Sequence, residues 1–130
     1  MLPIFALLLS LHATPASDSL AGRWQIKGDV MGNPVNEICT FTQADSVLTG
    51  NCAENENDEA MLLAGAIKDG KITFWHGGEW DGQPLTVVYS GLMSEPNVLK
   101  GTIEVRPMNV AGTFTMTPAP VPDATPAKKP

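Results

Sequence analysis

Residues 38–52 read ICTFTQADSVLTGNC and contain the only two cysteines of the chain. Two runs of β-branched and apolar residues flank a short polar break, which is typical of a β-hairpin. With a four-residue loop at the break, Cys39 lies opposite Cys52, and Phe41 lies opposite Gly50. Opposed β-carbons on one face of a hairpin are about 4.5–5.5 Å apart, close enough for a disulfide. We therefore expect a Cys39–Cys52 disulfide and an aromatic ring lying across a glycine.

A second hairpin is predicted around Asp69-Gly70, because Asp-Gly is among the strongest two-residue turn signals. The preceding residues 60–68, AMLLAGAIK, have helical as well as strand propensity. The turn, and the β-branched and aromatic run that follows it, favour a strand. Closing the hairpin on this turn again places a glycine, Gly65, opposite an aromatic residue, Phe74.

Eight strands and no convincing helix are expected along the chain. A tight turn at Pro107-Met108 would set Gly101 opposite Phe114 in the last pair. Since every connection is short, neighbours in sequence become neighbours in an antiparallel meander. Closure into an up-and-down barrel over residues 17–117 removes both sheet edges and buries the apolar face. The residues expected to have a packing role in this barrel are Gly22, Trp24, Gly50, Gly65, Phe74, Gly101 and Phe114.

The two ends of the chain differ in composition from the barrel. Residues 1–16 combine an apolar run with small residues before Ser17, typical of a secretory signal cleaved after Ala16, although no Lys or Arg precedes the run. A buried amino-terminal strand is the alternative. Residues 118–130 are rich in proline and alanine, and we expect an unfolded, polyproline-like tail. Export to the periplasm or the exterior would favour the disulfide over two free thiols.

Charge and composition exclude several classes of partner. The net charge of −6 gives no electrostatic reason to bind nucleic acid or an anionic membrane. The first apolar run is shorter than the ~20 residues of a spanning helix. A membrane barrel is not expected either, because charges would interrupt its lipid-facing band. These charges are Lys27, Glu37, Lys68, Lys100 and Glu104. No metal or other cofactor is expected, since two cysteines alone lack the further ligands of a zinc site.

Residues 77–82 are predicted to form a loop. The most site-like cluster is WHGGEWD, residues 75–81, which combines two indoles with an imidazole and carboxylates where a predicted strand runs into this loop. The candidate ligand-binding residues, from this cluster and the next strand, are Trp75, His76, Trp80, Tyr89 and Ser90. A strand edge followed by a solvated loop is the alternative interpretation. No nucleophile is paired with an evident base, so we do not expect an enzyme.

Several short motifs resemble avidin and streptavidin and, more loosely, the lipocalins. They are Gly22-x-Trp24, Leu48-Thr49-Gly50, Leu63-x-Gly65, Trp75, Tyr89-Ser90-Gly91 and Gly112-Thr113-Phe114. The resemblance implies an eight-stranded barrel that holds one small molecule at its mouth, with the acidic residues 54–59 as a lid. Gln25 to Gly28 and Gly112 stand where that family places polar groups for biotin, so biotin is not the expected ligand.

The sequence thus predicts an exported, non-catalytic barrel with a small apolar or aromatic ligand near Trp75 and Trp80. The alternative is a protein-interaction module, such as a periplasmic protease inhibitor or an envelope subunit, with a solidly filled barrel.

Overall fold

The computed structural model describes residues 19–54 and 59–120 of the chain. The predicted signal segment, residues 1–16, lies outside the described residues. The same holds for residues 55–58, the centre of the acidic segment predicted to be a lid, and for residues 121–130 of the proline-rich tail. Within the described ranges, no helix has the length and apolar character needed to cross a bilayer.

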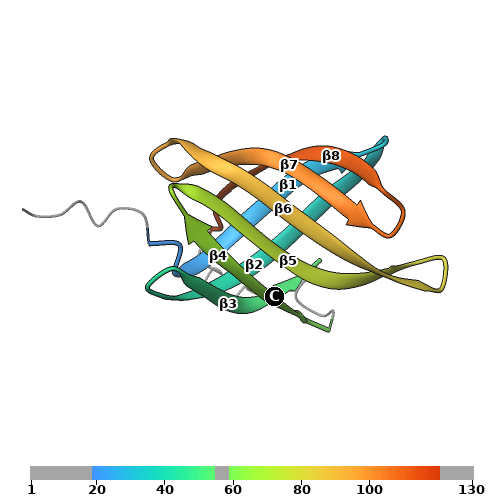
Figure 1. Ribbon diagram of the computed structural model, residues 1–130, viewed down its shortest axis with the longest axis horizontal. Coiled ribbons are helices and arrows are strands. Elements are labelled where there is room, and N and C mark those ends of the chain that lie inside the picture. Colours follow the sequence, from blue (N-terminus) through green and yellow to red (C-terminus); the bar gives the residue numbers. More distant parts are fainter. Residues whose placement is uncertain (1–18, 55–58, 121–130) are drawn as a thin grey trace, which may run out of the picture.

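Eight antiparallel strands form a closed barrel in sequential order, with β1 paired to both β2 and β8 (Figure 1). The predicted up-and-down barrel is therefore confirmed. The strands are β1 Gly22–Val30, β2 Asn33–Ala44, β3 Val47–Ala53, β4 Met61–Lys68, β5 Lys71–Trp80, β6 Gln83–Glu95, β7 Val98–Arg106 and β8 Val110–Pro118.

The β2–β3 hairpin has the register predicted from the sequence. Cys39 pairs with Cys52 and forms the expected disulfide, and Phe41 pairs with Gly50. The connection is tighter than the expected four-residue loop, because Ala44 also pairs with Val47. Both partners point outward at the end of the ladder, so the extra pair extends the hairpin without changing which residues face the core.

The expected loop over residues 77–82 is wrong, because β5 continues through it. Gly78 pairs with Leu85 and Trp80 pairs with Gln83, so only Asp81 and Gly82 form the turn. Both turn residues have positive φ, 52° and 80°, the conformation whose twist matches that of paired strands. The β5–β6 hairpin consequently extends beyond its neighbours at one end of the barrel (Figure 1).

Four aromatic rings fill the middle of the barrel. Phe74 stacks on Tyr89 with ring centroids 4.7 Å apart, and it meets Phe41 edge to face at 5.0 Å. Phe114 packs edge to face against Tyr89 at 5.1 Å. Gly101 lies opposite Phe114, as predicted, and a β-carbon on this glycine would collide with the carbonyl oxygen of Ser90. The strands approach one another closely here because the facing position carries no side chain.

Trp24 lies buried at the end of the barrel opposite the tip of the β5–β6 hairpin. Its indole Nε1 donates a hydrogen bond to the carbonyl of Leu20 at 2.8 Å. The backbone N–H of Leu20 in turn donates to Oε1 of Gln43 at 2.8 Å. The fully buried Leu20 side chain, together with Trp24, closes this end.

Two expectations about individual residues are corrected. Glu37 was predicted among the charges facing outward, but its place in β2 directs it into the barrel, where it is buried. Pro118 was assigned to the tail, yet it ends β8 and pairs with Trp24. The next residue, Ala119, donates a backbone hydrogen bond to the carbonyl of Arg23, which fixes the last strand to the first.

Candidate functional site

Three polar side chains meet inside the barrel at the end opposite Trp24. Oε1 of Glu37 accepts a hydrogen bond from the hydroxyl of Tyr89 at 2.7 Å and lies 2.9 Å from Nε2 of His76. All three residues are buried. We call this group, Glu37, His76 and Tyr89, the polar cluster.

Strand alternation explains how the polar cluster forms. Glu37 precedes the inward-facing Cys39 by two residues on β2, and His76 follows the inward-facing Phe74 by two residues on β5. Residues two apart on a strand share a face, so both side chains enter the interior. Tyr89 pairs with Phe74 across β5 and β6, which brings its hydroxyl to the same end.

The hydrogen-bond partners of His76 determine its protonation. Nδ1 lies 2.7 Å from the carbonyl oxygen of Gly77, which can only accept, so Nδ1 carries a proton. Nε2 faces the carboxylate of Glu37, which when ionised also only accepts. Burial lowers the pKa of His76. The hydrogen bond and charge of Glu37, together with the carbonyl of Gly77 and the charge of Glu54, raise it by more than burial lowers it, so the pKa lies above the ordinary value of 6.5. The raised pKa favours a protonated imidazole beside the Glu37 carboxylate.

Tyr89 supplies the second donor to Glu37. Burial raises the pKa of the Tyr89 phenol well above its ordinary value, and the charges of Glu37 and Glu54 raise it further. The phenol thus stays protonated at any physiological pH and donates to the carboxylate.

Partly exposed apolar side chains surround the polar cluster at this end. They pack against the core from three strands, β2, β6 and β8, and are Val35, Leu85, Val87 and Val110. Beyond them, Trp80 shares the inward face of β5 with His76, since it lies four residues further along the strand. A β-carbon on the intervening Gly78 would lie 3.1 Å from Cδ1 of Leu85, so that leucine covers the same face. We call this apolar ring and Trp80 the mouth of the barrel.

The structure brings together two of the five predicted ligand-binding residues. His76 and Tyr89 belong to the polar cluster, and Trp80 lies above them with 53% of its surface exposed. Trp75 and Ser90 alternate with the inward-facing residues and point outward. Trp75 is flanked there by Ala64 and Val88 on the neighbouring strands, away from the interior.

Glu37 was missed as a site residue by sequence reasoning. Its signal is the alternation in NEICTF, in which Glu37, Cys39 and Phe41 occupy every second position of β2. In the structure Cys39 and Phe41 face the interior, and the same period places the Glu37 carboxylate there. A charged residue was instead assumed to face solvent, which is the usual outcome for a glutamate.

The polar cluster adjoins the disulfide. A carboxylate oxygen of Glu37 and the sulfur atoms of Cys39 and Cys52 lie within 4.8 Å of one another. Because the sulfurs are bonded to each other, the oxidised protein offers only Glu37 from this group as a free ligand to a cation.

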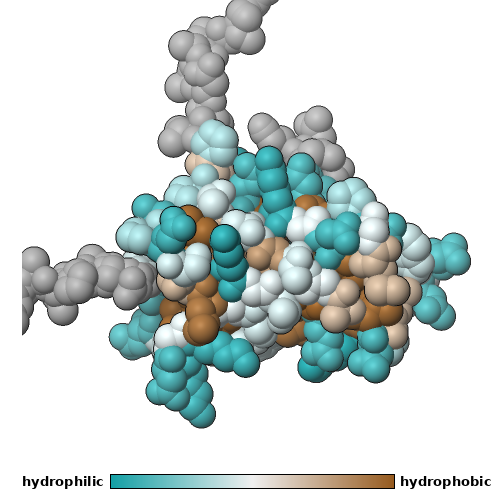
Figure 2. Space-filling view, turned by 90° about the horizontal axis from the view of Figure 1, so that it is seen from above, coloured by the Kyte–Doolittle hydropathy of each residue, from teal (hydrophilic) through white to brown (hydrophobic). Residues whose placement is uncertain are grey.

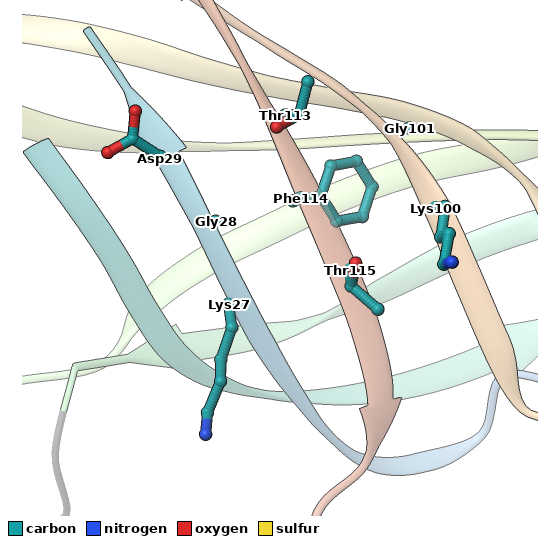
Figure 3. Close-up of a pocket in the computed structure, with 8 residues that line it drawn as sticks. All are labelled: Lys27, Gly28, Asp29, Lys100, Gly101, Thr113, Phe114 and Thr115. Atoms are coloured by element: carbon teal, nitrogen blue, oxygen red, sulfur yellow. The ribbon is translucent and has the colours of Figure 1, made fainter. Parts of the chain in front are cut away.

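Two shallow grooves lie outside the barrel. The larger, of about 500 Å³, crosses β1, β8 and β7 (Figure 3). Lys27 and Lys100 both pair with Thr115, so the two lysines flank that threonine on the outer face. The smaller groove, of about 310 Å³, lies near the mouth beside Leu85 and Arg106. On the side that bears β6 to β8, hydrophobic residues form separate groups around a centre of intermediate hydropathy (Figure 2).

Comparison with protein-family models, curated proteins and solved structures finds no match.

Proposed function

We propose that this chain is an exported, non-catalytic barrel of lipocalin-like or avidin-like type that binds a small apolar or aromatic ligand at its mouth. The observation that carries the proposal is the buried polar cluster directly beneath a ring of partly exposed apolar side chains. Small-molecule sites typically combine apolar walls with a few polar groups that fix orientation. Biotin is not the proposed ligand.

The energetic cost of the polar cluster supports a role in recognition. Burying an ion pair removes both charges from water, and apolar residues of similar volume would often be equally or more stabilising. The rest of the described interior is filled with apolar groups: aromatic rings, aliphatic side chains and a disulfide. Buried polar groups that cost stability, among them a histidine with a shifted pKa, are typical of a functional site.

The absence of catalysis is part of the same proposal. Each side chain of the polar cluster is engaged by another: the Tyr89 hydroxyl donates to Glu37, and Nε2 of His76 lies 2.9 Å from the same carboxylate oxygen. A catalytic role for His76 as a base would require it to lose the proton that Glu37 stabilises. The cluster is better suited to holding a ligand than to transferring protons.

Export is proposed from the disulfide. The sulfur atoms are buried and bonded to each other, and such bonds persist in oxidising compartments. A periplasmic or secreted protein meets this condition, and residues 1–16 have the composition of the signal that would direct it there.

Tryptophan fluorescence tests the ligand proposal. Purified protein is titrated with a panel of aromatic and fatty compounds, and the thermal midpoint is measured with each. We expect a hit to change the emission of wild-type protein and of the Trp75→Phe control, whose ring lies outside, but not of Trp80→Phe. If no compound changes either the emission or the thermal midpoint, the proposal is refuted.

The protein-interaction alternative has its own structural support. On the outer face, Leu62 is 83% exposed on β4, and the 41% exposed Trp75 lies on the neighbouring strand β5, where it pairs with Ala64, two residues from Leu62. Large exposed apolar side chains are typical of surfaces that bind another protein. Co-elution of the protein with a component of periplasmic or secreted extract, abolished in Leu62→Ser/Trp75→Ser but retained in Trp80→Phe, would favour this function over ligand binding.

A further inference from the structure

We propose that, once the disulfide is reduced, the interior beneath the mouth becomes a binding site for a thiophilic divalent cation such as Zn²⁺. The ligands are Cys39, Cys52, Glu37 and His76. The proposed site shares Glu37 and His76 with the polar cluster, but it concerns the reduced protein, and its test measures metal binding without any ligand at the mouth.

The separations of three of the four ligand atoms, those of Cys39, Cys52 and Glu37, fit a single small cation. A zinc ion lies about 2.3 Å from sulfur and about 2.0–2.2 Å from oxygen or nitrogen, so ligands around it are within roughly 4 Å of one another. In the oxidised protein, the two sulfurs and a Glu37 oxygen already lie within 4.8 Å of one another. Nε2 of His76 is 2.9 Å from Oε1 of Glu37. His76 lies outside the group of atoms within 4.8 Å of one another, so its Nε2 must turn from Glu37 toward the ion to complete the site. With that movement, four ligands of the types that zinc prefers come from three strands, β2, β3 and β5.

The hydrogen bonds around these ligands are those that metal sites use to orient them. A metal-binding histidine usually donates from its other nitrogen to a carbonyl or carboxylate, which fixes the tautomer. Nδ1 of His76 makes this bond to the carbonyl of Gly77 at 2.7 Å, leaving Nε2 directed at Glu37. Ligating carboxylates are likewise hydrogen-bonded, and the Tyr89 hydroxyl donates to Glu37 at 2.7 Å. Tyr89 is thus a positioning residue for the proposed site.

The chemistry of the switch balances as a thiol–disulfide exchange followed by metal binding. A thiolate of an external dithiol attacks one disulfide sulfur, and its second thiol then releases the mixed disulfide. The dithiol leaves as a disulfide, having given two electrons and two protons to Cys39 and Cys52. Binding of Zn²⁺ displaces one proton from each cysteine thiol and one from Nε2 of His76. Reoxidation reverses both steps, so disulfide and cation exclude each other.

Cobalt(II) is the probe for the test, because thiolate coordination gives a charge-transfer band and tetrahedral geometry gives visible bands. The full chain is reduced with a phosphine, freed of reductant without oxygen, and titrated with Co²⁺ alone, with near-UV circular dichroism recording the packing. We expect one Co²⁺ per chain with both features, displaced by Zn²⁺. The oxidised protein should show neither.

Variants identify the ligands. Cys39→Ser/Cys52→Ser should lose the charge-transfer band, and Glu37→Gln and His76→Gln should each weaken binding and alter the visible bands. Tyr89→Phe should keep the band positions but weaken binding about 10–100-fold, as expected when an outer-shell partner is lost. Glu104→Gln replaces an exposed carboxylate on β7, which carries none of the proposed ligands, and should behave like wild type.

Wild-type protein keeps the test decisive if a variant does not fold. Bound Co²⁺ should slow alkylation of Cys39 and Cys52 by iodoacetamide in the reduced chain. An unchanged alkylation rate, or the absence of a charge-transfer band in reduced wild-type protein, would overturn the proposal. The proposal would also be overturned if reduction abolished the near-UV circular dichroism signal and Co²⁺ did not restore it.

Discussion

Replacing Glu37 by glutamine should destabilise the protein far more than the same replacement of Glu104. Both carboxylates contact a basic side chain at nearly the same distance, 2.9 Å to His76 and 2.8 Å to Arg106. The side chains of the first pair are 7% and 2% exposed, whereas those of the second are 43% and 62% exposed. The two substitutions therefore compare burial at matched geometry.

The expected magnitudes follow from that difference. Removing one partner of a buried pair leaves an uncompensated charge and costs about 3–5 kcal/mol. For Glu37→Gln the lower value applies, because the amide oxygen can still accept from Tyr89 and His76 can lose its proton. An exposed pair contributes about 0–1 kcal/mol. At about 4–8 °C per kcal/mol for a domain of this size, Glu37→Gln should lower the thermal midpoint by roughly 12–24 °C.

Urea denaturation followed by tryptophan emission measures the free energy of unfolding. With an m-value of about 1–3 kcal/mol/M, a loss of about 3 kcal/mol moves the midpoint by at least ~1 M at unchanged slope. Glu104→Gln should move it by less than a third of that. Equal shifts in the two variants would refute the claim that burial makes the polar cluster energetically important.

Three further outcomes are expected. The raised pKa of His76 gives a contribution to stability that is complete below about pH 6.5, the unfolded pKa, and is lost as the pH rises through the folded pKa. Over that interval the urea midpoint of wild type should fall relative to that of His76→Gln. Urea midpoints of the two proteins that change in parallel with pH would contradict this prediction. Gly65→Ala should cost about 1–3 kcal/mol, because its β-carbon meets the neighbouring backbone, whereas Gly77→Ala, whose nearest neighbour is 3.8 Å away, should stay within about 0.5 kcal/mol; similar thermal midpoints would disprove the close approach. Cys39→Ala/Cys52→Ala should lose about 3 kcal/mol in denaturant unfolding, the value for a short closed loop, and an unchanged midpoint would exclude a stabilising cross-link.

The architecture was predictable because local signals agree with one another along the chain. The Asp69-Gly70 turn and the paired cysteines each determine a register, and those registers place an aromatic ring against a glycine repeatedly. Short connections then leave closure as the only arrangement without an exposed edge. The loop predicted over residues 77–82 failed because Gly77 and Gly78 were interpreted as breakers, although paired backbone continues through both.

The candidate site was only half predictable. His76 and Tyr89 were identified by residue type, but the partner that joins them, Glu37, lies 39 residues from His76 in sequence and was assigned to solvent. Trp75 was included because it neighbours His76 in sequence, yet adjacent residues on a strand face opposite sides. Closure of the barrel brings β2 and β5 together across the interior, and no local pattern reports that contact.

Pairing of β1 with β8 has a consequence for how the chain can be cut. Trp24 lies beside Pro118, and Ala119 bonds to Arg23, so the two outermost strands finish next to each other. A circular permutant, joined by a short linker after Ala119 and opened at Asp81-Gly82, therefore retains every ladder of the barrel. Because the sheet is a continuous ring, the strand at which the chain begins can change while the pairing of the strands stays the same.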